Sequence, residues 1–128
     1  MVAKGDWESS RALIREFVAE RDWERFHNVK DLAIGLGAEA GELLETVLWF
    51  TPEEIETRFR EEPELKTAMA DEVADVLFFV LRLCDKLQVS PHDILAAKIG
   101  KNRAKYPVSK ARGSAEKYTR FSGLEEKS

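Results

Sequence analysis

Four carboxylates occur as two pairs, each with a spacing of three residues. Glu39 and Glu42 lie in the segment GAEAGELLE, and Glu72 and Asp75 lie in the segment DEVADVLFF. Residues at positions i and i+3 of a helix have neighbouring Cβ atoms, so each pair can direct two carboxylates towards one point. The second pair continues, one turn later, into an apolar stripe at Phe79. A carboxylate that enters an apolar face needs either solvent or a cation beside it.

Metal binding is the chemistry that two such pairs favour if their helices meet. Unneutralised carboxylates would repel each other by about 4 kcal/mol per contact at about 4 Å, with an effective dielectric constant of about 20. One or two divalent cations reverse the sign of this interaction. Oxygen ligands without a nearby thiolate or paired imidazole favour Mg²⁺ or Mn²⁺ over zinc. Either motif alone is also common on a solvated helix face, and that reading stays open.

Helical periodicity predicts the elements that position these pairs. No segment alternates with a period of two for long enough to indicate a strand. The predicted helices are a first from a cap at Asp6 or Ser9 to about Arg21, a second from about Asp31 to Phe50, a short acidic helix after Thr51 and Pro52, a third over about 64–87, and a fourth from Ser90 to about Lys105.

The predicted fold class is therefore all-α, a helical bundle of four main helices. A chain of 128 residues with 44% hydrophobic content fits a single domain, 1–128, with a flexible C-terminal arm from about Val108. The second and third helices carry apolar stripes on more than one face, which exceeds what a monomer of this size buries. We expect a homo-oligomer assembled through a helical dimer core.

The composition of the chain indicates which classes of binding partner and which cellular compartment to expect. A net charge of −4 argues against general nucleic-acid binding, although residues 98–117 hold seven Lys or Arg and one acid, a basic end suited to an anionic ligand. The N-terminal sequence has no apolar run long enough for a signal peptide or a membrane span. The single cysteine, Cys84, falls at an apolar helix position and indicates a core residue in a reducing compartment. We expect a cytoplasmic protein without a membrane partner.

Longer motifs carry a resemblance to a known family. The segments ERDWERFHNVKDL, GELLETVLW and DEVADVL, and the pattern K-x-x-x-N-R-x-x-Y-P from Lys98 to Pro107, occur in this order. Together they resemble the MazG-like superfamily of all-α nucleoside triphosphate pyrophosphohydrolases, and within it the dCTP pyrophosphatase branch, over about residues 12–120. The resemblance implies cleavage between the α and β phosphates, with dCTP or a modified dCTP as the substrate and nucleotide-pool sanitation as the role.

The resemblance also implies roles for individual residues. The family pattern has Mg²⁺, with Mn²⁺ as a substitute, held by Glu39, Glu42, Glu72 and Asp75. Substrate contacts are implied for Lys98 and Asn102, and a nucleoside pocket for Trp23 and Trp49. Family members assemble as dimers or dimers of dimers, so the expected assembly extends to a homotetramer. A carboxylate not saturated by metal can deprotonate a water, and Glu39 or Glu42 is the candidate.

Further substrate residues follow from their chemistry. Lys98 and Asn102 recur on one face of the fourth helix and offer donors to phosphate oxygens, with Arg103 and Tyr106 as supporting candidates. His27 can donate to a phosphate or a base, or cap a helix. The remaining candidates near the nucleoside end are Ile14 and Phe79, where some members of the branch carry histidine and tyrosine; these departures leave the base and sugar preference open.

Two other functions compete with this interpretation. A ferritin-like di-metal bundle expects a histidine three residues after a glutamate on two helices. His27 follows Glu24 at that spacing but His92 follows no glutamate by three, so the required second motif is missing from the sequence. The second alternative is a non-catalytic helical oligomerisation or interaction module with solvated carboxylates. Its stability would not respond to a divalent metal.

Overall fold

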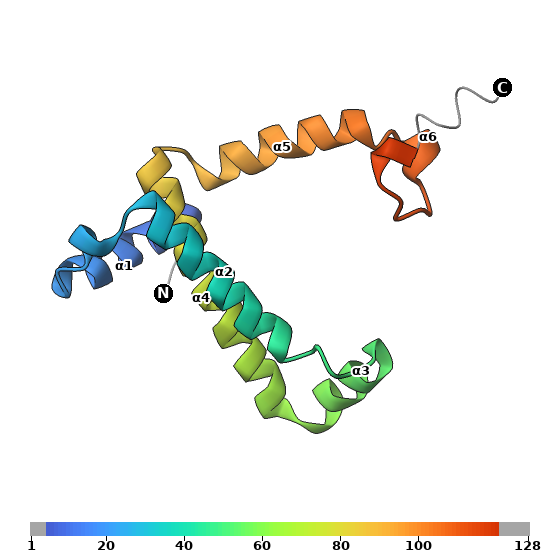
Figure 1. Cartoon of the computed structure of the whole chain (residues 1–128), viewed down its shortest axis with the longest axis horizontal. Coiled ribbons are helices and arrows are strands. Elements are labelled where there is room, and N and C mark those ends of the chain that lie inside the picture. The colour runs from blue at the N-terminus through green and yellow to red at the C-terminus, as the bar shows by residue number, and fades with distance from the viewer. Residues whose placement is uncertain (1–4, 121–128) are drawn as a thin grey trace. The chain divides into compact units, whose positions relative to one another are not determined.

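Helices account for the regular structure of residues 5–120, which are the residues that the computed structural model describes (Figure 1). No strand occurs in this range, so the all-α prediction is confirmed. The elements are α1 (Trp7–Glu20), η1 (Glu24–Phe26), α2 (Val29–Glu45), α3 (Pro52–Glu61), α4 (Pro63–Leu87), α5 (Pro91–Lys105), α6 (Val108–Ala111) and η2 (Tyr118–Arg120). The chain divides into two units, the first ending at Val89 and the second beginning at Ser90. A single domain over 1–128 stays a prediction.

Side-chain caps determine where four of the helices begin. Asp6, Asn28, Thr51 and Ser90 each accept a hydrogen bond from the backbone N–H three residues further on. Such a cap satisfies one of the amide groups that the first turn leaves without an intrahelical partner. Proline follows directly after the cap in α3 and α5, where its missing N–H costs nothing. Three of the four caps were predicted, and Asn28 starts α2 two residues earlier than expected.

Helix α2 ends at Glu45, so the prediction that it continues to Phe50 is wrong. The reason is local. The Thr46 hydroxyl donates to the Leu43 carbonyl at 2.7 Å, and the Thr46 N–H donates to the same carbonyl at 3.2 Å. These bonds tighten the last turn and compete with continuation of the helix. Residues 46–49 form turns instead, which removes Trp49 from the helix stripe that carries the first carboxylate pair.

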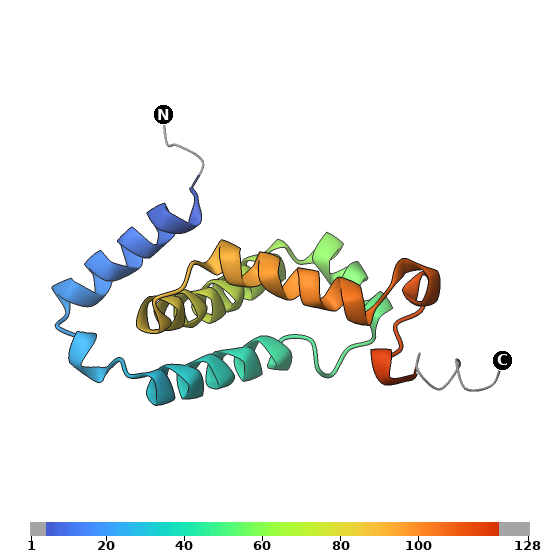
Figure 2. The same ribbon diagram turned by 90° about the horizontal axis from the view of Figure 1, so that it is seen from above.

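Helix α4 is the central element of the first unit and contacts α1, α2 and α3. Helices α2 and α4 lie side by side and antiparallel (Figures 1 and 2). The best-buried apolar side chains are Val18, Leu32 and Leu81, one from each of α1, α2 and α4 and each 1% exposed. Cys84 is 3% exposed, which confirms it as a core residue. The core therefore joins the first turn of α2 to the last turns of α4.

The second unit contains α5, α6 and η2. Helix α5 ends at Lys105, with Tyr106 as its C-cap immediately before Pro107, as predicted. The expected C-terminal arm begins with a short helix, α6, and its described part ends with η2, where the rings of Tyr106 and Tyr118 lie 6.0 Å apart edge to face. Residues 121–128 of that arm lie outside the described residues, and its flexibility stays a prediction.

Candidate metal centre

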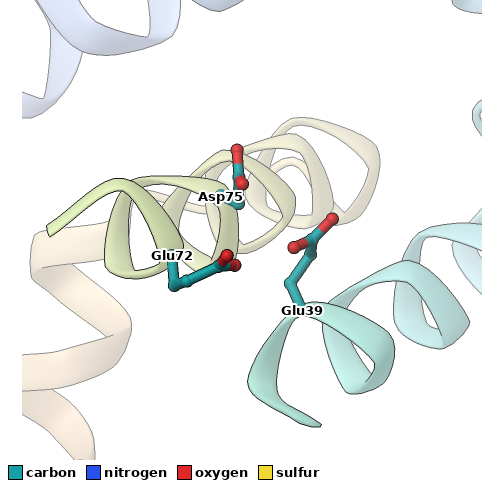
Figure 3. Close-up of side chains that lie close together, drawn as sticks. All are labelled: Glu39, Glu72 and Asp75. Atoms are coloured by element: carbon teal, nitrogen blue, oxygen red, sulfur yellow. The ribbon is translucent and has the colours of Figure 1, made fainter. Parts of the chain in front are cut away.

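Three of the four predicted metal ligands converge between α2 and α4. Glu39 projects from α2, and Glu72 and Asp75 project from α4 (Figure 3). Each offers one carboxylate oxygen, and these oxygens all lie within 4.8 Å of one another. The i, i+3 spacing on α4 places Glu72 and Asp75 on one face, and the antiparallel packing brings Glu39 opposite them. The predicted meeting of the two carboxylate-bearing helices is thus observed.

The cluster is electrostatically unfavourable in the absence of a cation. Hydrogen bonding to Glu42, which requires a proton between the two carboxyl groups, raises the pKa of Glu39, and burial and the Glu42, Asp75 and Glu72 charges raise it further. Burial, followed by the charge of Glu42, raises the pKa of Glu72. The Oε2 atoms of Glu39 and Glu72 are both buried without a hydrogen-bond partner. Buried carboxylate oxygens of this kind need a cation or a proton.

Glu42 occupies a different position from the other three. It is exposed and lies outside the group whose oxygens converge. Its influence on the pKa of Glu39 and of Glu72 nevertheless places its carboxylate beside them. Glu42 can therefore complete the ligand set or accept a proton at the edge of the site.

A divalent cation fits this donor set. All the converging ligand atoms are carboxylate oxygens, the donor type that Mg²⁺, Mn²⁺ and Ca²⁺ prefer. A bound cation would give the two orphaned Oε2 atoms a partner and would offset the repulsion among the carboxylates. Glu39, Glu72 and Asp75 are the residues that could hold it, with Glu42 adjacent.

The predicted nucleoside-side residues of the first unit are spread over several elements. Trp23 lies at the start of η1, is 41% exposed and packs edge to face on Phe17 at 5.5 Å. Trp49 is 81% exposed in the turn after α2. Phe79 is half-buried on α4, with its ring against Gly35 and edge to face on Phe78 at 5.3 Å. Only Phe79 shares a helix with the carboxylates, one turn beyond Asp75.

His27 belongs to a charged network that the sequence interpretation missed. Its Nδ1 atom accepts a hydrogen bond from Nε of Arg82 at 3.1 Å, so the imidazole is neutral in this arrangement. Burial, followed by the Arg82 charge, lowers the pKa of His27. Arg82 is 3% exposed and also donates to Glu24 and to Asp85. Arg82 and Asp85 carry opposite charges three residues apart among the apolar residues near the end of α4, a sequence signal that indicates an ion pair.

The predicted phosphate-binding residues lie in the second unit. Lys98, Asn102 and Arg103 are all on α5, and Tyr106 follows its last residue. The exposed Lys98 and the half-buried Asn102 are one turn apart, so both can project from one face of the helix. Their role as substrate contacts stays a prediction.

None of the helices formed by residues 5–120 combines the length and the hydropathy that crossing a membrane requires.

Comparison with known proteins agrees with the fold. The chain is 38% identical over 112 residues to dCTP pyrophosphatase 1 of Bos taurus and of Homo sapiens; the match covers 88% of the chain but only 66% and 65% of those proteins. The chain thus spans about two thirds of their length. It is 33% identical to a pyrophosphatase from Archaeoglobus fulgidus of known crystal structure, with a TM-score of 0.71 over 84% of this chain and 99% of that one. A model of the MazG-like family matches residues 34–121, and the chain belongs to that family.

Proposed function

We propose that this protein is a Mg²⁺-dependent nucleoside triphosphate pyrophosphohydrolase that converts a (d)NTP, with dCTP or a modified dCTP preferred, to the monophosphate and pyrophosphate. The observation that carries the proposal is the convergence of Glu39, Glu72 and Asp75 with two buried oxygens that have no protein partner. The similar proteins are named as pyrophosphatases, which supports the proposed reaction class. Those named dCTP pyrophosphatase 1 support the proposed preference for cytosine.

Mg²⁺ would be held by Glu39, Glu72 and Asp75, with Mn²⁺ as a substitute. When bound, such a cation neutralises phosphate oxygens and polarises the phosphorus that is attacked. The protein must also activate a water. Glu42 is exposed at the edge of the cluster, so of the two catalytic candidates, Glu39 and Glu42, it is the freer to accept the proton.

The reaction then balances as a hydrolysis. The water oxygen forms a bond to the α-phosphorus while its proton passes to the carboxylate of Glu42. The bond between the α-phosphorus and the bridging oxygen breaks, and pyrophosphate leaves with that oxygen. The neighbouring Glu42 and burial raise the pKa of Glu39, and perturbed carboxylates of this kind are typical of functional sites, which supports the proposal.

Substrate binding is assigned to two sets of residues. Aromatic stacking by Trp23 and Trp49 would hold the base, with Phe79 and His27 at the nucleoside end; both tryptophans expose enough surface for stacking. The side chains proposed to contact phosphate oxygens are Lys98, Asn102, Arg103 and Tyr106 of the second unit.

We further propose a cytoplasmic homo-oligomer, either a dimer or a dimer of dimers. Several large apolar side chains are exposed, including Leu13 at 69%, Trp49 at 81% and Val108 at 75%. Exposed apolar surface of this extent is typical of a chain that is buried against further copies. The buried, unbonded Cys84 agrees with a reducing compartment.

The test is a panel of dNTPs and NTPs, including modified cytosine nucleotides, assayed for monophosphate and pyrophosphate with Mg²⁺, Mn²⁺ or a chelator. We expect metal-dependent release of pyrophosphate that Glu72→Gln abolishes. The matched control is Glu45→Gln, which removes an exposed carboxylate of α2 outside the cluster. Release of inorganic phosphate in place of pyrophosphate would refute the proposed cleavage position. The absence of turnover with both metals would refute the proposal and favour the non-catalytic oligomerisation module.

A further inference from the structure

Gly35 of α2 faces the ring of Phe79 of α4 with no space for a side chain. A Cβ atom built on Gly35 would lie 2.6 Å from Cζ of Phe79 and 3.0 Å from its Cδ1, whereas ordinary van der Waals contact begins at 3.4 Å. Gly37 and Gly41 of the same helix have no atom within 4 Å of the corresponding position. The α2 backbone therefore meets the Phe79 ring directly at Gly35.

This contact lies one helical turn from the carboxylate cluster on both helices. Gly35 precedes Glu39 by four residues on α2, and Phe79 follows Asp75 by four residues on α4. Residues four apart share a helix face. Because α2 and α4 are antiparallel (Figure 1), the Gly35–Phe79 contact lies one helical turn from the place where Glu39 and Asp75 approach each other (Figure 3).

We infer that Gly35 is a positioning residue for the metal centre. By admitting the Phe79 ring against the α2 backbone, it sets the separation of α2 and α4 at which the ligand oxygens of Glu39, Glu72 and Asp75 converge within 4.8 Å. The ring is itself braced by Phe78, which it meets edge to face at an interplanar angle of 85°. The inference rests on the proposed function in one respect, namely that the cluster binds a divalent cation.

The size of the effect follows from the geometry. With alanine at position 35, Cζ of Phe79 has to retreat from 2.6 Å to 3.4 Å, a movement of about 0.8 Å. Ligand distances in a working metal site are held to about 0.2 Å. If the helices take up the movement, Glu39 is displaced from the other ligands by several times that tolerance. Loss of a supporting contact typically weakens metal binding by about 10- to 100-fold, and we expect a loss in that range for Gly35→Ala.

The experiment is a titration with Mn²⁺ alone, followed by calorimetry, on the full chain. We compare the wild type, Gly35→Ala, Gly37→Ala and the double variant Gly35→Ala with Phe79→Leu. Gly37→Ala is the matched control, since it adds the same methyl group to the same helix where nothing lies within 4 Å. Leucine lacks the Cε1 and Cζ atoms that cause the clash, so the double variant is expected to recover affinity. Phe79 is also a proposed substrate residue, and metal affinity separates the two roles.

Unchanged Mn²⁺ affinity in Gly35→Ala, or an equal loss in Gly37→Ala, would overturn the inference and leave the proposed function intact. Failure of Phe79→Leu to restore affinity would also overturn it, because the ring would then not be the cause. If Gly35→Ala does not fold, Phe79→Leu is compared with the double variant: equal affinities support the inference, and a weaker double variant contradicts it. Mn²⁺ binding that Glu72→Gln leaves unchanged would remove the proposed metal centre and this inference with it.

Discussion

Substitution of Asp85 by alanine provides a sharp test of the charged network that joins α1, η1 and α4. Oδ1 of Asp85 accepts hydrogen bonds from Nε of Arg11 and from a terminal nitrogen of Arg15, both at 2.8 Å. Its Oδ2 accepts one from a terminal nitrogen of Arg82 at 3.3 Å. Although burial raises it, hydrogen bonds from Arg15 and Arg11 hold the pKa of Asp85 below its ordinary value. One carboxylate thus accepts hydrogen bonds from three guanidinium groups and partly compensates their positive charges.

The expected loss of stability follows from how buried these groups are. The side chains of Asp85, Arg11 and Arg82 are 11%, 13% and 4% exposed. Removing one partner of a buried ion pair costs about 3–5 kcal/mol, because the remaining charge is left without compensation. Arg82 keeps Glu24 and His27 as partners, which reduces the expected loss to just below that range, about 2–3 kcal/mol. For a chain of this length that corresponds to a decrease in Tm of about 10 °C.

The assay is urea unfolding at pH 7 and a fixed protomer concentration, because the proposed oligomerisation would make stability depend on concentration. The matched control is Glu8→Ala, which removes another acid that pairs with Arg11 and Arg15, at 3.8 and 3.2 Å. Its side chain is 70% exposed, so the expected loss is below about 1 kcal/mol. Equal losses of stability for Asp85→Ala and Glu8→Ala would refute the claim that burial makes the Asp85 ion pairs more stabilising than exposed ones.

Three further predictions concern metal, pH and packing. Mg²⁺ at a hundredfold excess over its Kd should raise the free energy of unfolding by about 2.7 kcal/mol, which calorimetry detects as a higher Tm. Glu72→Gln should remove this response. Because the pKa of His27 is lowered from 6.5 in the folded state, the unfolded chain binds that proton more readily; stability should be full above about pH 6.5 and fall as the pH decreases below it. Glutamine keeps an acceptor for Arg82 but does not titrate. The midpoint of urea unfolding should therefore decrease less between pH 7 and pH 5 in His27→Gln than in the wild type. Leu32→Ala, at a side chain 1% exposed, should cost about 3 kcal/mol in urea unfolding, and a loss below about 1 kcal/mol would contradict its place in the core.

The helices and their caps could be predicted because both depend on nearby residues. Apolar spacing indicated α2 and α4, and the motif of Thr51 followed by Pro52 marked the start of α3. The end of α2 could not be predicted in the same way. The Thr46 hydroxyl competes with the helix only because it meets the Leu43 carbonyl, and periodicity does not register that competition.

The two carboxylate pairs were predictable because each depends on a local spacing within one helix; that the two helices meet depends on packing between residues far apart in the chain. The contacts around the carboxylates were not predictable, since they also join residues far apart in the chain. His27 meets Arg82 across 55 positions, and Gly35 meets Phe79 across two antiparallel helices. The sequence places Gly35, Gly37 and Gly41 near Glu39 but does not show which of them a side chain of α4 approaches.

The burial of two carboxylate oxygens in the cluster favours a metal-binding site over a solvated helix face. A solvated helix face leaves its carboxylate oxygens in water, where the pKa stays ordinary and the repulsion is screened. Here the Oε2 atoms of Glu39 and Glu72 are buried without partners, and the pKa of both groups is raised. An interaction module gains nothing from that arrangement, because apolar side chains at the same positions would pack α2 against α4 without the cost. A divalent cation turns the same arrangement into a favourable one, so the cost in the metal-free chain is the reason to expect that Mg²⁺ stabilises the wild type and not Glu72→Gln.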